Sequence, residues 1–418
     1  MSKGRELPVA GPAEANDGGL VSSSDAASGV PGRRGFSTRF GRLIRGVLLV
    51  GWAVLVVGLC VIPVLPKLPA WGFALSLLVS SCSLYMLIPA LIGFVLVVVI
   101  WRTGRRWLTV AVAVVALLAV VAAVMPWVAA SRTASANGVP LSLGTYFSSG
   151  PRVSGPASTE VYAQIDGARL ELDVWQPSAP ARGGPAVVWV HGGGWTSGHR
   201  SQKPTMDQWY TDRGYTVFDI DYRLSPPPRW QEEVSDVKCA IGWVAHNAER
   251  YHIDPADITV AGGSAGANLA MLAAYTVGTG VYPPSCDVPE HQVRAVISLF
   301  GPTDTAVRDT GTPSISSARQ RDYFGGDPTA VPEAYRTTSP ITYVRAGLPP
   351  TLQIQGSLDH IVPTSETRRM DDLLAKAGVA HRTVMLPWTE HAYDSFWGSW
   401  GTQISYGVID QFLTTYTR

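Results

Sequence analysis

Residues 258–268 read ITVAGGSAGAN, an apolar run that passes through Gly262, Gly263 and Ser264 into an alanine-rich segment. The run at 258–261 is typical of a buried strand, and 265–277 is typical of a helix. Ser264 therefore lies at a sharp strand-to-helix turn, where only glycine neighbours leave enough room. A glycine-rich turn that binds phosphate has a similar sequence. The pentapeptide Gly-X-Ser-X-Gly is therefore informative only together with its surroundings.

The surroundings predict an α/β fold. From residue 159 onward, short apolar runs alternate with helix-length segments, which is typical of βαβ units and a mostly parallel sheet covered on both faces. A hairpin that turns at Asp166-Gly167 is expected to open this domain, which spans 159–418. The expected strands are at 161–165, 170–175, 186–190, 216–220, 258–261, 295–300, 351–355 and 383–386, and the expected helices at 231–250, 265–277 and 364–377.

A second glycine cluster follows the strand expected at 186–190. Residues 191–195 read HGGGW. Consecutive glycines after a buried strand let backbone N–H groups point into a site, as an oxyanion requires. A flexible loop is the alternative, but it does not explain why a histidine and a tryptophan bracket the glycines. His191 is expected to brace the loop rather than to act as a base.

An acid and then a histidine follow Ser264, in the order Ser, Asp, His that a serine nucleophile on such a strand-to-helix turn needs. Asp359 comes after the strand expected at 351–355, and His391 comes after the next strand. Carboxyl ends of parallel strands meet at one edge of the sheet, where Ser264 also lies. The rival acids and histidines lie within a helix, after His391, or before the last strand ends: Asp371, Asp372, Asp394, His360 and His381.

These motifs together resemble the α/β-hydrolase superfamily, in the branch of hormone-sensitive-lipase-like and feruloyl-esterase-like carboxylesterases. The whole chain resembles membrane-anchored Lip-type esterases of actinobacteria. The matching segments are 191–195, 221–226, 262–266, 356–359 and 390–392.

The resemblance implies a role for each site residue. Ser264 would be the nucleophile, His391 the general base and Asp359 the residue that orients it. The backbone N–H groups of Gly193, Gly194 and Ala265 would form the oxyanion hole. His191, Gly192 and Trp195 would support that loop, and 221–226 would pack and anchor it. Such families build a cap or acyl pocket at the position of 303–343, where the sequence indicates no clear structure.

The apolar residues concentrate before this domain. The chain has 418 residues, of which 46% are hydrophobic and 16% charged. Three uncharged runs at 47–66, 71–101 and 107–130 each exceed the roughly 18 residues that cross a bilayer as a helix. We therefore predict a three-helix membrane anchor at 43–130. A disordered leader is expected at 1–42, which has almost no large apolar side chains, and an extended linker at 131–158.

Arginines indicate the orientation of the anchor. Five arginines at 33–45 precede the first run and three lie in the second connection, whereas the first connection carries only Lys67. The positive-inside rule therefore predicts a cytoplasmic N-terminus and an extracytoplasmic catalytic domain in the cell membrane. Residues 134–136 read ASA and resemble a peptidase site, so cleavage after Ala136 remains an alternative.

The cysteines and the net charge indicate which bonds, cofactors and binding partners to expect. Cys239 and Cys286 are the only cysteines in the hydrolase domain, on the predicted oxidising side, and we hypothesise that they form a disulfide; two free thiols are the alternative. No His/Cys pairing at ligand spacing implies a metal, and no cofactor is expected. A net charge of +1 does not favour nucleic acid.

The expected function is that of a membrane-anchored serine carboxylesterase or lipase that hydrolyses short- to medium-chain acyl esters. Its substrate would be a small-molecule or lipid ester. A formamidase or acyltransferase with the same triad is an alternative, and so is a catalytically silent membrane sensor or scaffold. The sequence indicates neither the natural substrate nor the oligomeric state.

Overall fold

The computed structural model describes residues 33–307 and 313–417. The chain divides into two compact units, 1–51 and 52–418. The described part of the first unit is helical and forms the beginning of α1 (Arg33–Val61). The disordered leader expected at 1–42 is therefore wrong for 33–42, which are helical, and its first 32 residues lie outside the described part.

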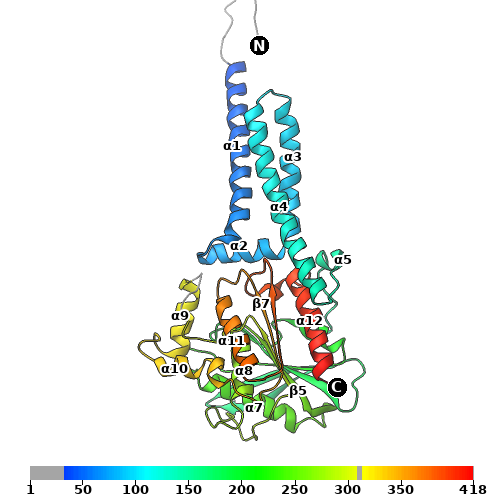
Figure 1. The fold of residues 1–418 in the computed structure, drawn as a ribbon, viewed down its shortest axis with the longest axis vertical. Coiled ribbons are helices and arrows are strands. Elements are labelled where there is room, and N and C mark those ends of the chain that lie inside the picture. The colour runs from blue at the N-terminus through cyan, green and yellow to red at the C-terminus, as the bar shows by residue number, and fades with distance from the viewer. Residues whose placement is uncertain (1–32, 308–312, 418) are drawn as a thin grey trace, which may run out of the picture. The chain divides into compact units, whose positions relative to one another are not determined.

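The second unit contains an eight-stranded sheet in the order β1-β2-β4-β3-β5-β6-β7-β8. Figure 1 labels β5 and β7 of this sheet. β1 and β2, and β2 and β4, pair antiparallel, while the other neighbouring strands pair parallel. The predicted α/β class is thus confirmed. The strands are β1 (Ser158–Ile165), β2 (Ala168–Trp175), β3 (Gly184–Val190), β4 (Thr216–Ile220), β5 (Ile253–Gly263), β6 (Ala295–Leu299), β7 (Thr351–Gly356) and β8 (His381–Leu386).

The first hairpin turns where the sequence predicted. Asp166 and Gly167 link β1 to β2 and have φ angles of 51° and 80°. Positive φ at both central residues suits the tight turns that join twisted antiparallel strands, and an Asp-Gly pair adopts it at little cost.

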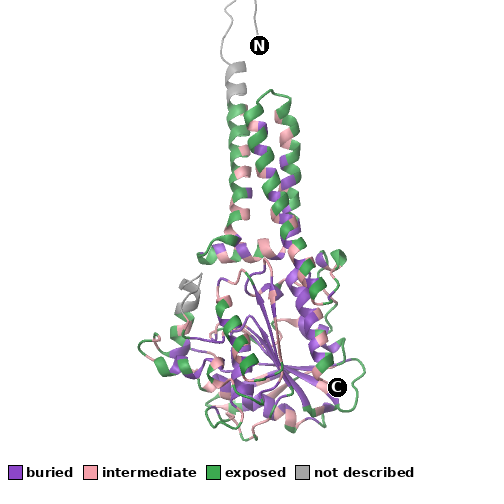
Figure 2. Cartoon of the chain, viewed as in Figure 1, coloured by how far each residue is buried: buried purple, intermediate pink, exposed green. Residues whose placement is uncertain are grey.

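Helices cover both faces of the sheet. Along β3, Val188 and Val190 pack with α7, α8 and α11, whereas Val187 and Trp189 pack with α6 and α12. The inner strands β3, β4, β6 and β7 are accordingly buried on both sides (Figure 2), which explains their uninterrupted apolar runs. These helices are α6 (Pro204–Thr211), α7 (Glu232–His246), α8 (Ala265–Tyr275), α11 (Thr364–Lys376) and α12 (Trp400–Tyr416).

The segment at 303–343, for which the sequence indicated no structure, contains two helices and a short 3-10 turn. They are α9 (Pro313–Phe324), α10 (Pro332–Thr337) and η3 (Pro340–Tyr343). Tyr323 and Phe324 at the end of α9 are buried in the same core as α7 and α8. The segment is therefore built onto the domain by aromatic packing.

Within the described residues, three helices are long and apolar enough to cross a membrane: Phe40–Val64, Ser83–Trp101 and Arg106–Ala136. The uncharged run at 71–101 was expected to form one helix, and this expectation is wrong. The run forms α2 (Ala70–Ser81), a 3-10 turn η2 (Ser83–Met86) and α3 (Leu87–Trp101). Ser80, Ser81 and Ser83 lie at the break. Serine hydroxyls compete with helical hydrogen bonds.

The segment at 131–158 is not the extended linker that its composition indicated. Helix α4 (Arg106–Ala136) continues past residue 130, and a short α5 (Leu143–Tyr146) follows it. Ala130 and Ala134 are buried in the core that contains α12, and the Tyr146 ring stacks on Trp400 at 4.3 Å. Small alanines spaced by four residues let α4 approach this core closely. The peptidase-like site at 134–136 therefore lies in a packed helix.

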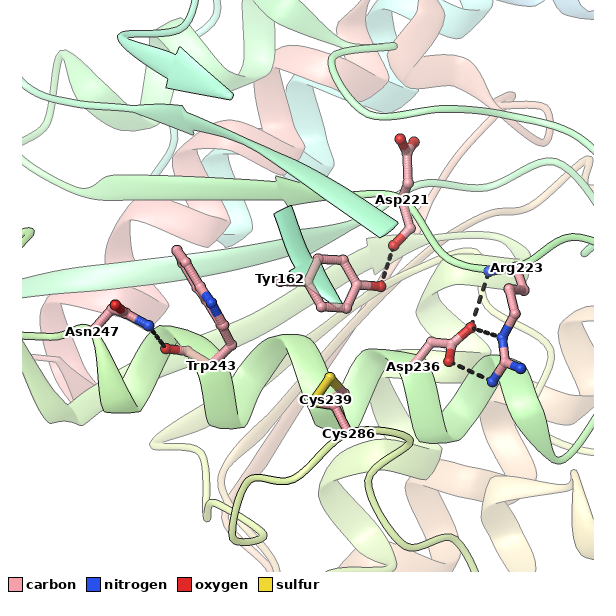
Figure 3. Close-up of a disulfide and its surroundings, with 8 residues drawn as sticks. All are labelled: Tyr162, Asp221, Arg223, Asp236, Cys239, Trp243, Asn247 and Cys286. Carbon is pink, nitrogen blue, oxygen red and sulfur yellow. Dashed lines mark hydrogen bonds and ion pairs between the residues drawn. A yellow bond between two sulfur atoms is a disulfide. The ribbon is translucent and has the colours of Figure 1, made fainter. Parts of the chain in front are cut away.

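A disulfide joins Cys239 on α7 to Cys286 (Figure 3), which confirms the hypothesised pairing. Near it, Arg223 forms a buried bidentate ion pair with Asp236 of α7. Its Nη2 lies 2.7 Å from Oδ1 and its Nε 2.9 Å from Oδ2. The side chains are 7% and 0% exposed. This pair fixes the 221–226 segment on α7, in agreement with the packing role predicted for it.

Removing Asp236 is expected to leave the Arg223 guanidinium buried without its bidentate partner, since the remaining acids around it are partly exposed. Breaking a buried pair in this way typically costs about 3–5 kcal/mol. Asp236→Ala should therefore lower the Tm of the full chain by several degrees, measured by scanning fluorimetry in detergent. Glu333→Ala removes a matched but exposed pair with Arg336 and should leave the Tm unchanged. Equal Tm values for both variants would contradict the prediction.

Candidate active site

Ser264 lies on the turn between β5 and α8 with φ 55° and ψ −123°, a strained conformation for a residue with a side chain. Its N–H donates to the carbonyl of Leu299 at 2.9 Å. A Cβ on Gly262 would lie within 2.6 Å of the Gly266 backbone, and one on Gly266 would overlap the carbonyl groups of Val190 and His191. The two glycines are therefore required where β5, α8 and the end of β3 converge.

The structure brings together the three residues that the sequence predicted as a triad. Nε2 of His391 lies 2.9 Å from Oγ of Ser264, and Nδ1 lies 2.9 Å from Oδ2 of Asp359. Asp359 is held in turn, because its Oδ1 accepts the N–H groups of Ile361 and Val362 at 2.9 and 2.7 Å. A hydroxyl, an imidazole and a buried carboxylate thus form one hydrogen-bonded chain.

The charges around His391 determine its protonation. Burial alone lowers the pKa of His391, but the charge of Asp359 and the hydrogen bond to it outweigh burial. The charges of Glu390 and Asp394 act in the same direction, so the pKa of His391 is raised above its ordinary value of 6.5. His391 is therefore well suited to accept a proton from Ser264.

The loop after β3 carries amides that have no hydrogen-bond acceptor among the residues that the structure describes. Gly193 and Gly194 have φ angles of 131° and 62°, and a Cβ on Gly193 would overlap the carbonyl of Ser197. Within the described part of the chain, no hydrogen bond of the N–H groups of Gly193, Gly194 or Ala265 is found. Gly193 and Gly194 line the same cavity as Ser264. Ala265 follows Ser264 at the start of α8, where helix amides have no intrahelical acceptor.

The residues predicted to support this loop are packed around it. The His191 ring stacks on Tyr222 at 4.3 Å, and burial lowers the pKa of His191 to about 4, so it is neutral at physiological pH. Gly192 has no room for a Cβ, which would lie 2.7 Å from the carbonyl oxygen of Gly263. The Trp195 ring stacks on Tyr323 at 4.6 Å, and its carbonyl accepts the N–H of Ser225 at 3.0 Å.

A cavity of about 290 Å³ opens beside Ser264 and is bordered by residues that the sequence did not single out. Phe73 of α2 reaches it from far away in the sequence, and no local pattern could have indicated this. Glu366 also borders it; burial raises the pKa of Glu366 to about 8 even though it accepts the N–H groups of Thr303 and Asp304. The apolar lining residues include Phe73, Trp189, Phe300, Val307, Ile361 and Val362.

Glu390 is a further residue to which the sequence assigned no role of its own. It belongs to the 390–392 motif, is fully buried, and accepts hydrogen bonds from His391 and from the rejected triad candidate His360. His360 thus lies next to the site but pairs with Glu390 and not with Ser264. In the described ranges, no cluster of three or more His, Cys, Asp or Glu residues could hold a metal ion.

The fold and this hydrogen-bonded site define an α/β-hydrolase. The BD-FAE family model matches residues 172–374. Two relatives from Mycobacterium tuberculosis are similar: "Probable carboxylic ester hydrolase LipM", 31% identical over 58% of this chain, and esterase LipQ, 32% identical over 53%. The matches span 57% and 54% of those relatives' own lengths.

The solved structure of Thermogutta terrifontis esterase 2 is also similar, with 26% identity and a TM-score of 0.54 over 64% of this chain and 98% of that one. The same esterase is known with propionate bound and with butyrate bound. The chain is thus similar to carboxylesterases with the α/β-hydrolase fold.

The raised pKa of His391 predicts how the reactivity of Ser264 depends on pH. Only neutral His391 can accept the serine proton, so labelling of Ser264 by a fluorophosphonate should slow as the pH falls through a pKa above 6.5. Asp359→Asn removes the charge that raises this pKa, so the midpoint should move to lower pH. The plateau rate should also fall, by roughly 10⁴-fold, because the tautomer of His391 changes. An unchanged midpoint in Asp359→Asn would contradict the electrostatic assignment.

Proposed function

We propose that this protein is a membrane-anchored serine carboxylesterase that hydrolyses short- to medium-chain acyl esters. The observation that carries the proposal is the hydrogen-bonded chain from Ser264 through His391 to Asp359, which opens onto a cavity beside free backbone amides. The names of the relatives and the solved esterase support the same reaction class.

In the proposed mechanism, Oγ of Ser264 attacks the ester carbonyl carbon while Nε2 of His391 takes its proton. Asp359 keeps Nδ1 protonated and stabilises the imidazolium without taking the proton itself. The N–H groups of Gly193, Gly194 and Ala265 stabilise the negative oxygen of the tetrahedral intermediate. His391 then gives its proton to the leaving alcohol, and a water molecule releases the acyl group from Ser264 by the same sequence of steps.

The cavity supports a small acyl group. At about 290 Å³ it lies at the lower end of ligand-site volumes, and its apolar side chains suit a short hydrocarbon chain. The esterase structures with propionate and butyrate bound point to the same size of acyl group. The cavity binds the acyl group in either case, so the proposed substrate class includes both free small-molecule esters and lipid esters.

Hydrolysis of a series of p-nitrophenyl esters by the full chain in detergent tests the reaction. We expect the highest kcat/KM for chains of about two to eight carbons, and a loss of roughly 10⁵-fold or more in Ser264→Ala. Ser148→Ala is a matched control, because within the described residues the Ser148 hydroxyl hydrogen-bonds only to the carbonyl of Thr145. Equal activity of wild type and Ser264→Ala would contradict the proposal.

The same samples separate the esterase from its alternatives. Transfer of the acyl group to added hydroxylamine in preference to water would indicate an acyltransferase, and turnover of formamides without ester hydrolysis would indicate a formamidase. A wild-type chain that no fluorophosphonate labels would be a silent scaffold.

We further propose that the N-terminus is cytoplasmic and that the catalytic domain lies outside the cytoplasm. The three apolar helices and the arginines at 102, 105 and 106 support this orientation. Alkaline phosphatase fused after Tyr416 should therefore be active in bacterial cells, and the enzyme fused after Gly104 should be inactive, because it matures only outside the cytoplasm. The reverse pattern would overturn the orientation.

A further inference from the structure

Helix α2 (Ala70–Ser81) contacts the catalytic domain through a buried serine. Ser76 is 0% exposed, and its Oγ donates a hydrogen bond to Oε2 of Glu390 at 2.6 Å. Trp71 and Leu78 of the same helix are exposed. With 12 residues, α2 is too short to span a bilayer. Helix α2, which lies between two candidate membrane spans in the sequence, therefore contacts Glu390, the residue before His391, through Ser76.

Glu390 connects α2 to both loops of the predicted triad. Its Oε1 accepts the backbone N–H groups of His360 and His391, each at 2.9 Å. Its Oε2 accepts the Ser76 hydroxyl and Nδ1 of His360, each at 2.6 Å. These four bonds occupy the acceptor sites of an ionised carboxylate. The backbone next to Asp359 and the backbone of His391 are thus held by one side chain, which Ser76 orients.

A second bond ties the same loop to the anchor. Nε2 of His360 lies 2.8 Å from the carbonyl oxygen of Leu65, just before α2. A carbonyl can only accept, and the Glu390 carboxylate also accepts, so both ring nitrogens of His360 carry hydrogens. Burial lowers the pKa of His360, but the hydrogen bond and charge of Glu390 outweigh it and raise the pKa. The hydrogen-bonded pair of His360 and Glu390 therefore lies between the anchor and the triad.

The same helix borders the substrate cavity. Phe73, one turn before Ser76, lines the cavity together with Ser264 and His391. Its ring closes part of the apolar wall that also includes Ile361 and Val362. Contact with the cavity and contact with Glu390 thus come from adjacent turns of one helix.

We propose that α2 is an integral part of the active site. Ser76 is a positioning residue that acts on His391 through Glu390, and Phe73 limits the length of the acyl chain that the cavity accepts. This inference rests on the proposed esterase function. The membrane anchor would then contribute to catalysis and specificity in addition to holding the enzyme at the membrane.

Ser76→Ala in the full chain tests the positioning role. It removes one of the two donors to the buried Oε2 of Glu390 and leaves His360 as the other, so the 388–392 loop should loosen. We expect kcat to fall on the order of tenfold with KM little changed, because small displacements of a catalytic group slow chemistry more than binding. Ser80→Ala is the matched control on the same helix, since in the described part of the chain the Ser80 hydroxyl hydrogen-bonds only to the carbonyl of Leu77.

Hydrogen exchange measured by mass spectrometry gives a readout that does not depend on activity. In Ser76→Ala, peptides that contain the amides of His360 and His391 should exchange faster, because both amides donate to Glu390. The remaining strands of the sheet should exchange as in the wild type. Ser80→Ala should match the wild type throughout.

Phe73→Ala tests the cavity wall. Loss of the ring enlarges the cavity, so the optimum of the ester series should shift to longer acyl chains. An unchanged chain-length profile would overturn the role of Phe73.

The outcomes distinguish this inference from the proposed function. Wild-type kcat and wild-type exchange in Ser76→Ala would overturn the positioning role, whether or not the protein is an esterase. If the wild type hydrolyses no ester but Ser76→Ala still speeds exchange at His360 and His391, the coupling stands and the esterase proposal fails.

Discussion

The left-handed backbone of Ser264 is the constraint on which the site depends. A residue with a side chain adopts φ 55° at a cost, and here neighbouring packing maintains it. The amide of Ser264 bonds to the end of β6, and Gly266 packs against the carbonyl groups at the end of β3. The serine hydroxyl is thereby raised above the sheet edge, where loops after β3, β7 and β8 can reach it. Any larger residue at 262 or 266 would separate these elements.

Buried charges around this turn are paired and hydrogen-bonded. Asp359 accepts from His391 and from two backbone amides, and Glu390 accepts four hydrogen bonds. Ions taken out of water are tolerated in proteins only with such partners. The two carboxylates differ in what they hold, because Asp359 orients the imidazole whereas Glu390 holds the backbone that carries it. Together they restrict both the side chain and the main chain of His391.

Local patterns predicted the elements that depend on local physics. Alternation of apolar runs and helix-length segments placed the strands and helices of the sheet, because parallel strands are buried on both faces. The order of Ser264, Asp359 and His391 along the chain placed all three at one edge. The errors arose where length or composition was interpreted without context. The uncharged run at 71–101 breaks at its serines, α4 extends past residue 130 because its alanines pack near α12, and the leader becomes helical at Arg33.

The sequence by itself determined the α/β architecture, the strand-turn-helix at Ser264, its hydrogen-bonding partners and the presence of long apolar helices. Each of these follows from residue types at short spacing or from the rule that parallel strands end at one edge. Only the tertiary structure decided which distant residues complete the site. Phe73 and Ser76 lie in an apolar segment with no local signal, and their roles arise because α2 packs on the loop that carries Glu390, 314 residues away from Ser76. Contacts between residues so far apart depend on how whole elements pack, which no short pattern encodes.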